Sequence, residues 1–517
     1  MKKQPWKQRM ERKIAAALRI FLVVLLLAVQ IAVVLLLAHV LHQRMIYVYA
    51  LLQIAAIVCA VRIYQRSGGS SYKAGWIILI LSLPVAGIIL YYLWHGNHAA
   101  KHLGLRELRV PQETEAQRET SRRQIEKLRR KSPAWGRLAA QLDSHGYRLY
   151  DRTEMFYFPA GEAYLEDMLR QMERAEHFIF MEYYIVSQGE IWEEISCVLQ
   201  RKAAEGVEVK VIFDDFGSML RLSRQEIAAL RAAGVEVQSF NPVHQYVNRL
   251  YFNYRDHRKI TCIDGEIAYT GGVNLADEYA NRIVRFGHWK DCGIRLNGQG
   301  SWGLTRQFIH MWERMGGTMQ QEHDYYRPST MPESVGFCQC VADGPDNNPA
   351  NPIEDAFLQM ISMARHMVYI TTPYLAIDEP MLRALCIAGD SGVDVRLMVP
   401  GIPDHKMSYL LAESYFEELL RHGVKVYRYE PGLLHGKTVM VDREVAFVGT
   451  VNMDYRSFQL HFECGAMLYD IPVVEQLLED MDDIMAKSRQ LELDEWVKRP
   501  LRRKIAGALL RPFAVWM

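Results

Sequence analysis

Three long apolar runs dominate the first hundred residues of the chain. Leu18 to Leu41 is apolar except at three positions, Ile46 to Ile63 is shorter, and Ala74 to Trp94 contains one proline. A helix needs about 20 apolar residues to cross a bilayer. The pattern predicts a transmembrane anchor of two or three spans over residues 1–98. For the second run alone, a buried helical hairpin of a soluble protein is the alternative.

Basic residues around these runs bear on the orientation. Six Lys or Arg residues precede the first run, and residues 99–145 form a basic linker after the third. Under the positive-inside rule, the basic N-terminus and the basic linker should both lie in the cytoplasm. Two spans would place them on the same side of the membrane, whereas three spans would place them on opposite sides. The eight cysteines show no disulfide-framework spacing, which favours a reducing compartment. We expect a multi-pass protein of the cell membrane, with a cytoplasmic body favoured over an external one.

A different pattern begins near residue 146. Short runs rich in β-branched and aromatic residues, such as HFIFMEYYIV from His177 and GVEVKVIFDD from Gly206, alternate with stretches of helical periodicity. Regular alternation of strands and helices is typical of layered α/β folds. The sequence therefore predicts an α/β fold for the body of the chain.

The alternating pattern occurs twice. ARHMVYITTPYL from Ala364 matches AEHFIFMEYYI from Ala175, and GVDVRLMV from Gly392 matches the run from Gly206, in the same order. Copies of this length indicate a duplicated domain and not a short-period solenoid. We expect a first half at residues 146–325, a second half at 326–490, and a basic amphipathic tail at 491–517. That tail either lies on a membrane or is solvated.

Each half carries the pattern H-x-K-x-x-x-x-D, followed at the same distance by a small-residue turn and an asparagine. One H-x-K is uninformative, but two copies that agree at all these positions are not chance. The two sets are His257, Lys259, Asp264 and Asn274, and His435, Lys437, Asp442 and Asn452.

This pattern suits a phosphodiester. Alternate side chains of a strand share a face, so the histidine and lysine of each motif point together. Two halves meeting about a pseudo-twofold axis would join both pairs in one cleft. Lysines and asparagine amides can neutralise the phosphate oxygens, while one imidazole attacks phosphorus and the other protonates the leaving group. No metal or cofactor is expected, because Lys259 and Lys437 supply the positive charge.

Composition narrows the partners. The chain has 61 basic and 60 acidic residues, and its basic clusters lie beside apolar runs. A nucleic-acid binder usually shows a basic footprint, whereas such clusters suit an anionic membrane surface. We expect a membrane and no nucleic acid among the partners; the sequence sets no oligomeric state.

The motifs resemble the phospholipase D superfamily. EYYI at Glu182, TPYL from Thr372 and NMDYRSF from Asn452 are similar to the bacterial cardiolipin synthases in particular. The resemblance implies two pseudo-twofold-related α/β/α sandwich halves behind a transmembrane segment. It implies a phosphatidyltransferase that converts two phosphatidylglycerol molecules into cardiolipin and glycerol through a phosphatidyl-histidine. We assign His257 as nucleophile and His435 as general acid and base, although pseudosymmetry permits the reverse.

The resemblance also implies a carboxylate that orients each histidine. Asp291, in HWKDCGIRL, and Glu463, in HFECGAML, follow the two motifs and begin apolar strand-like runs. A carboxylate on the far imidazole nitrogen fixes the tautomer and stabilises the imidazolium. Asp264 and Asp442, grouped with the catalytic residues by the motif, are then expected to anchor the adjoining turns.

The turns before the two asparagines differ slightly from the superfamily pattern. Gly272 stands in the first and Thr450 in the second. Both residues are small, so we expect the backbone to remain accessible to a phosphate and the enzyme to be active.

Three hypotheses compete: a membrane-anchored transferase, a hydrolase such as a phospholipase D or a nuclease, and a non-catalytic membrane scaffold. Intact motifs argue against the scaffold, and the apolar runs with balanced charge argue against the nuclease. Water and a lipid hydroxyl are separated only by pocket shape, so the sequence leaves transferase and hydrolase open.

Overall fold

The computed structural model describes residues 45–66, 70–94, 103, 105–106, 114–219, 221–242, 253–347, 350–469 and 472–516. The chain forms two compact units, one of residues 1–97 with 247–251 and one of residues 98–246 with 252–517. The first apolar run, Leu18 to Leu41, lies outside the described residues.

The N-terminal unit consists of helices α2 (Met45–Gln65), α3 (Ser70–Ser82) and α4 (Pro84–Trp94). Helix α2 covers the second apolar run, and its segment Tyr47–Gln65 is long and apolar enough to cross a membrane. The third run is not one continuous helix, because proline lacks an N–H and its ring clashes with the preceding turn. The number of spans stays a prediction.

The first half of the larger unit is built on a seven-stranded mixed sheet. Its strands lie in the order β1, β9, β7, β6, β2, β3, β4. Their bounds are β1 (Thr153–Phe158), β2 (Phe178–Tyr183), β3 (Glu208–Asp214), β4 (Glu236–Phe240), β6 (Lys259–Ile263), β7 (Ile267–Gly271) and β9 (Gly293–Gly298).

The second half repeats this sheet strand for strand. The order is β10, β19, β17, β16, β11, β13, β14, with β20 added at the edge. The bounds are β10 (Phe337–Asp343), β11 (Met367–Thr371), β13 (Asp394–Pro400), β14 (Lys425–Tyr429), β16 (Thr438–Val441), β17 (Val445–Gly449), β19 (His461–Tyr469) and β20 (Ser488–Gln490). The duplicated α/β architecture expected from the sequence is confirmed.

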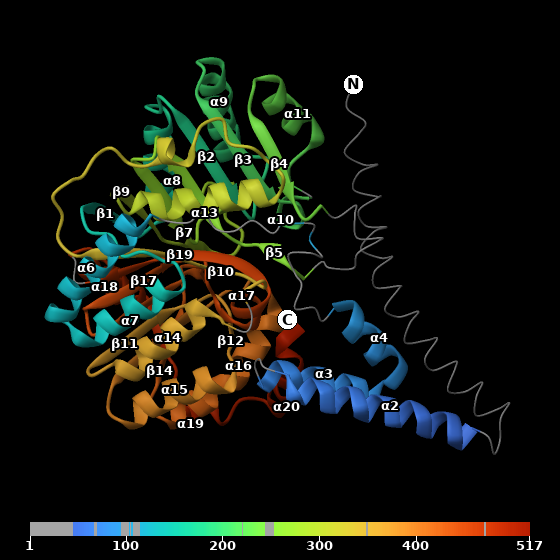
Figure 1. Ribbon diagram of the computed structural model, residues 1–517. Helices are drawn as coiled ribbons and strands as arrows, with labels where there is room; N and C mark the ends of the chain where they lie inside the picture. Colours follow the sequence, from blue (N-terminus) through green and yellow to red (C-terminus); the bar gives the residue numbers. More distant parts are fainter. Residues whose placement is uncertain are drawn as a thin grey trace. The chain divides into compact units, whose positions relative to one another are not determined.

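Helices cover both faces of each sheet (Figure 1). In the first half these are α8 (Gly161–Met172), α9 (Glu190–Ala204), α10 (Asp215–Ser218), α11 (Arg224–Ala232), η2 (Asp277–Ala280) and α13 (Ser301–Arg314). In the second half they are α14 (Pro352–Met363), α15 (Glu379–Asp390), α16 (Lys406–Arg421), α17 (Tyr455–Gln459) and α18 (Val473–Ala486).

Strand periodicity divides the core. Along β2, Phe178 and Phe180 join one buried cluster, while Ile179 and Met181 join another on the opposite face. The first cluster also contains apolar side chains of α13, α18 and the second sheet, so it runs between the two sheets. One continuous core therefore holds both halves together.

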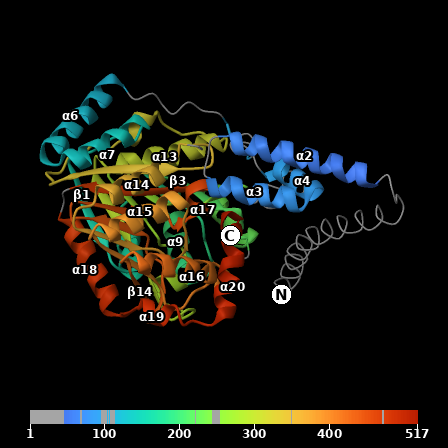
Figure 2. The same ribbon diagram turned by 90° about the horizontal axis from the view of Figure 1, so that it is seen from below.

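Three segments outside the two sheets also contain helices: the basic linker, the connector that joins the two halves near residues 315–340, and the tail. Within the basic linker, α6 (Glu115–Lys131) and α7 (Pro133–Ser144) are helices, and Gln339 donates to the carbonyl of Ala139 on α7. The connector between the halves contains η3 (His323–Tyr326). The tail forms α19 (Leu493–Trp496), α20 (Leu501–Leu510) and η4 (Arg511–Trp516), with α20 beside α16 (Figure 2).

Candidate active site

The strand that leads into the first motif changes sheets at the histidine. Its initial part, β5 (Arg255–Asp256), pairs in parallel with the start of β19 in the other half. The backbone N–H of His257 donates to the carbonyl of Phe462 at 2.9 Å, and β6 then continues in the first sheet. His257 therefore lies at the seam between the halves.

The second motif repeats this crossover. Strand β15 (Gly432–Leu434) pairs in parallel with β8 (His288–Lys290) of the first half. The N–H of His435 donates to the carbonyl of Lys290 at 2.7 Å, after which β16 continues in the second sheet. The two crossovers bring both histidines to one seam, as the pseudo-twofold relation required.

Each histidine meets a carboxylate from the opposite half. His257 Nδ1 lies 2.9 Å from Glu463 Oε1, and His435 Nδ1 lies 2.7 Å from Asp291 Oδ2. Both carboxylates are buried. A buried carboxylate favours the N–H on Nδ1, which leaves the Nε2 lone pair of each ring available.

Burial and neighbouring cations keep both imidazoles neutral. The pKa of His257 is well below its usual value because of burial first and then Lys259 and Lys437. Burial and Lys437 also lower the pKa of His435, while Asp291 opposes them. Burial alone would raise the pKa of Asp291, but the charge and hydrogen bond of His435 bring it below its ordinary range.

The two motif lysines lie beside their histidines. Lys259 Nζ donates to the carbonyl of His257 at 2.6 Å, and Lys437 Nζ lies 2.8 Å from His435 Nδ1. Burial lowers the pKa of Lys259 to about 7 and that of Lys437 to about 8. An anion placed between them would favour their charged forms, so the pair is suited to a phosphate.

One hydroxyl distinguishes the two halves of the site. Thr450 Oγ1 donates to Glu463 Oε2, whereas the equivalent position in the first half is Gly272. A Cβ at Gly272 would lie 2.0 Å from Asp291 Oδ1, so the Asp291 carboxylate occupies that space. The glycine and the threonine are therefore each matched to their carboxylate.

Different rings contact the two histidines. Tyr184 and His461 lie against His257, with ring centroids 5.1 and 5.6 Å away. Tyr279 and Trp289 lie against His435, both at 5.4 Å. His461 and Trp289 each precede the histidine-binding carboxylate by two residues, so strand alternation places them on the same face as that carboxylate. Counting back two residues from Asp291 and from Glu463 would have identified Trp289 and His461 in the sequence.

The asparagines occupy buried positions behind the motifs. Asn274 Oδ1 accepts from Ile185 N, and its Nδ2 donates to Tyr279 Oη at 2.8 Å. The backbone N–H of Asn452 donates to Ser457 Oγ, and its Oδ1 has no hydrogen-bond partner among the described residues. Asn274 thus supports the loop next to the site, and phosphate binding by either amide stays a prediction.

The motif aspartates lie at the opposite end of their strands from the histidines. Asp264 accepts three backbone N–H groups, those of residues 176–178, and Asp442 accepts those of residues 365–367. Both have φ of +53°, at the turn that leaves the motif strand. Their oxygens fix the entrances of β2 and β11, which fits the expected anchoring role, and a catalytic role for either aspartate stays a prediction.

Within the part of the chain that the structure describes, one group of side chains has the geometry of a metal site. The ligating atoms of His257, His461 and Glu463 lie within 4.8 Å of one another. Lys259 and Lys437 lower the pKa of His257 from nearby, and the same positive charge disfavours a cation there. The two lysines therefore favour an anion over a metal ion at this position.

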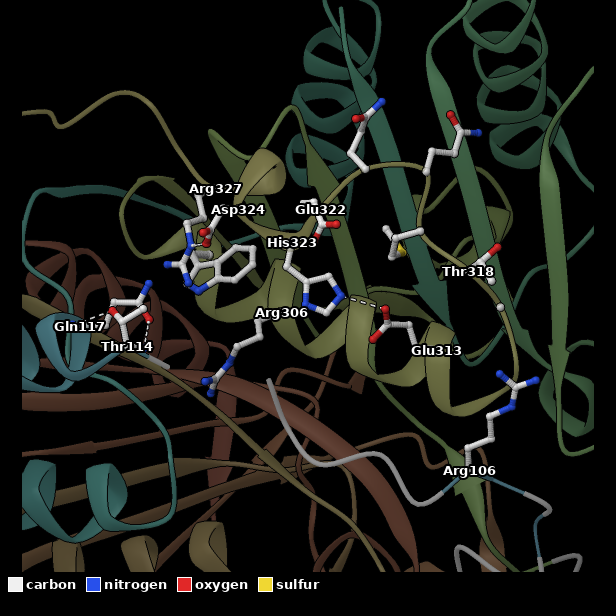
Figure 3. Close-up of a pocket in the computed structure, with 15 residues that line it drawn as sticks. Arg106, Thr114, Gln117, Arg306, Glu313, Thr318, Glu322, His323, Asp324 and Arg327 are labelled. Atoms are coloured by element: carbon white, nitrogen blue, oxygen red, sulfur yellow. Dashed lines mark hydrogen bonds and ion pairs between the residues drawn. The ribbon is translucent and has the colours of Figure 1, made fainter. Parts of the chain in front are cut away.

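A cavity of 830 Å³ lies elsewhere, between α13 and the segment that follows it (Figure 3). Its charged side chains are largely engaged with each other: His323 Nε2 lies 2.8 Å from Glu313, and Arg327 donates to Asp324. Arg306 donates to the carbonyl of Gly146. None of the residues that line this cavity belongs to the histidine site, so the cavity is separate from that site.

Comparisons with known proteins agree with this geometry. A family model described as cardiolipin synthase, PLD-like domain, matches residues 168–283 and 357–485, and one described as phospholipase D-nuclease N-terminal matches residues 54–95. Cardiolipin synthase 2 of Bacillus anthracis is 35% identical over 89% of each chain. Cardiolipin synthase of Geobacillus kaustophilus is 34% identical over 89% of this chain and 92% of its own.

A solved structure supports the fold alone. Phosphatidylserine synthase from Haemophilus influenzae superposes with a TM-score of 0.55 and 15% identity, over 71% of this chain and 94% of that one. The duplicated fold and paired H-x-K site are those of the phospholipase D superfamily. Within it, the chain belongs to the family of cardiolipin synthases, which are membrane-associated phosphatidyltransferases.

Proposed function

We propose that the chain makes cardiolipin from two phosphatidylglycerol molecules and releases glycerol. The observation that carries the proposal is the pair of neutral imidazoles, each backed by a carboxylate from the other half, with two lysines beside them. A phosphodiester fits this arrangement because the lysines can balance its charge while two imidazoles handle bond making and proton transfer.

In the first step, His257 Nε2 attacks the phosphorus of the donor lipid. The anionic lipid phosphate raises the pKa of His435, so in the complex His435 carries a second proton, on Nε2. The bond from phosphorus to the glycerol oxygen breaks, and His435 gives that oxygen the Nε2 proton. In the second step, His435 takes the proton of a hydroxyl on a second phosphatidylglycerol. The freed oxygen attacks phosphorus, the phosphorus–nitrogen bond breaks, and His257 leaves as the neutral imidazole.

The assignment of the two roles rests on the asymmetry of the site. Burial, Lys259 and Lys437 hold the pKa of His257 well below its usual value, which suits a neutral nucleophile. Its carboxylate, Glu463, already accepts a hydrogen bond from Thr450 and stabilises an imidazolium less. Asp291 accepts the backbone N–H of Cys292 as well, but its charge and its hydrogen bond to His435 both favour the imidazolium, so His435 is better suited to carry a proton.

Lysines and carboxylates have supporting roles in this proposal. Lys259 and Lys437 hold the non-bridging oxygens, and Asp291 and Glu463 orient the imidazoles. Asn274 and Asn452 complete the phosphate site after local rearrangement of their amides. No step needs a metal or a cofactor, since the charges balance through the two lysines.

The experiment supplies the purified full-length chain in vesicles with phosphatidylglycerol and follows the lipid products. We expect cardiolipin and glycerol in equal amounts. Phosphatidic acid without cardiolipin would instead identify a hydrolase, and cleavage of nucleic acid a nuclease. No reaction of any of these substrates would leave the scaffold hypothesis.

The histidine roles are tested with a phosphatidyl donor that carries a p-nitrophenol leaving group, which needs no proton. His435→Asn should release one nitrophenolate per enzyme and retain the phosphatidyl group on His257, whereas His257→Asn should release none. His422→Gln, at a histidine that follows the last residue of α16 and pairs with Asp390, serves as the control. A burst from His257→Asn and none from His435→Asn would reverse the two roles.

We further propose that the N-terminal segment crosses the cell membrane more than once and that the body is cytoplasmic. Support comes from α2, which has spanning length, and from the eight cysteines, all of which are free thiols. Cys197 is exposed. An impermeant maleimide should label it only after the cells are opened; labelling in intact cells would place the body outside.

A further inference from the structure

A loop and the segment that leads into the first turn of α16 expose large apolar side chains in the body. Ile283 and Val284 are 49% and 81% exposed in the loop of residues 281–287, and Ile402 and Met407 are 41% and 54% exposed in residues 401–407. These two segments together are called the rim. Exposure of bulky apolar groups in a cluster indicates a surface that is covered by something other than water.

The rim is assembled from both halves of the molecule. Residues 281–287 belong to the first half and 401–407 to the second. The N–H of Ile402 donates to the carbonyl of Gly432, which forms a bridge with Gly287. A Cβ at Gly287 would lie 3.2 Å from Ile402 Cδ1, so the two segments are in contact.

The rim borders the histidine site. The loop of residues 281–287 joins Tyr279 to Trp289, and both of those rings contact His435. On the other segment, Asp404 is near enough for its charge to oppose the lowering of the pKa values of His435 and Lys437. A ligand that approaches His435 from this side therefore passes the rim.

Basic groups surround the apolar positions. Arg285 is half-exposed, and Lys406 and His405 are exposed. Arg285 pairs with Glu278 and Arg282 pairs with Glu194, whereas Lys406 forms no ion pair with any described residue. Asp404 accepts a hydrogen bond from Tyr374 through one oxygen. The rim thus presents an apolar centre with a basic fringe, which complements the acyl region and anionic headgroups of a bilayer.

We propose that the rim inserts into the surface of an anionic bilayer and places the mouth of the histidine site at the level of the lipid phosphates. Burying Ile283, Val284, Ile402 and Met407 among acyl chains removes apolar area from water. Lys406 then meets a lipid phosphate. This inference rests on the proposed action on a lipid phosphate, but insertion is measurable without turnover.

The chain offers a matched pair of positions for the test. Val284 is in the rim, whereas Val335 is 65% exposed beside Ser334, which bonds Thr153. Thr153 pairs with Gly298, the end of β9 farthest from Asp291. Val335 is therefore an exposed valine at the opposite end of the sheet from the site.

The first experiment uses the full-length chain in vesicles that contain phosphatidylglycerol. Cysteine is introduced by Val284→Cys or Val335→Cys in a Cys197→Ser background, so that the described exposed thiol is removed, and is labelled with an environment-sensitive fluorophore. We expect blue-shifted emission at position 284, quenched by about half by lipids with a nitroxide in the upper acyl chain. Position 335 should show neither effect.

The second experiment separates insertion from chemistry. Val284→Asp should slow turnover of vesicle-borne phosphatidylglycerol about tenfold, the factor for a loss near 1.4 kcal/mol, and leave turnover of a monomeric short-chain phosphatidylglycerol unchanged. Val335→Asp should change neither rate. No quenching at position 284 overturns the proposal, as does emission that shifts only with protein concentration, which would identify a second copy of the chain as the occupant. An inactive wild type with position 284 quenched would reject the proposed function and keep the insertion.

Discussion

At the scale of single residues, one hydroxyl separates the two halves of the site. Thr450 donates to Glu463, which in turn holds His257, and nothing equivalent exists at Gly272. The sequence shows the difference between Gly272 and Thr450, but from the sequence we could interpret both only as small residues. Its meaning depends on contact with a carboxylate of a neighbouring strand, which one-dimensional spacing does not reveal.

Thr450→Val should lower turnover, because it removes a hydrogen bond to a buried carboxylate, worth about 1–3 kcal/mol. Glu463 then becomes more basic, so the pKa of His257 rises and more of the nucleophile is protonated. We expect the acidic limb of kcat/KM to move to higher pH by about one unit for 1.4 kcal/mol, with about a tenfold loss of kcat/KM on that limb and a smaller loss at neutral pH. Thr450→Ser, which keeps the hydroxyl, should restore both values; an unchanged acidic limb in Thr450→Val would contradict this role.

The motif lysines predict the alkaline side of the pH profile. A lysine is charged only below its pKa, which burial lowers to about 7 for Lys259 and about 8 for Lys437. We therefore expect kcat/KM to fall as the pH rises from 7 through 8. The limb of kcat should lie at higher pH, because bound phosphate favours the charged lysines.

Lys437→Arg provides the check, since a guanidinium stays charged throughout this range. Its residual activity should lose less of its kcat/KM between pH 7 and pH 9 than the wild type does. If kcat/KM of the arginine variant falls at high pH as it does in the wild type, the alkaline limb does not arise from Lys437.

At the scale of elements, the motif aspartates fix the starts of two strands that the sequence repeats predicted. Asp264 and Asp442 each bind three successive backbone N–H groups at the start of a central strand. The sequence favoured an anchoring role for them. It could not identify the anchored segments, because residues 176–178 and 365–367 precede the aspartates that bind them by 75 positions or more.

Asp442→Ala should destabilise the fold more than it impairs chemistry. Three N–H groups at the entrance of β11 lose a charged acceptor, and we expect a loss of about 2–5 kcal/mol in the free energy of unfolding. Thermal or denaturant unfolding of the purified protein measures it. Glu479→Ala, at an exposed position of α18, should change stability by less than about 0.5 kcal/mol. If the Asp442→Ala variant were fully stable but inactive, Asp442 would have a catalytic role instead of a structural one.

At the scale of the whole molecule, the two halves form one site and one core. Lys290 and Tyr157 of the first half both bond Asp480 of the second, and the core cluster between the sheets draws on both. The exposed connector near residues 328–335 is the main covalent link between them. Association of the halves should therefore not depend on this connector.

A chain interrupted after Glu333 tests this. Residues 1–333 and 334–517, produced together, should copurify and retain transfer activity, because the buried surface and paired strands hold them in register. Either fragment alone should be inactive, since each histidine needs the carboxylate of the other. Activity from one fragment alone would contradict the shared site.

The sequence by itself determined the duplication, the α/β architecture and the chemical identity of the site. Strand alternation and the repeated spacing of His257, Lys259, His435 and Lys437 are local properties, so they can be read along the chain. The tertiary structure decided the pairing of His257 with Glu463, 206 residues away, and of His435 with Asp291. Those pairs exist because β5 and β15 each begin in the other half's strands before crossing over. Partners of that kind are fixed by packing between the halves, which no spacing along the chain records.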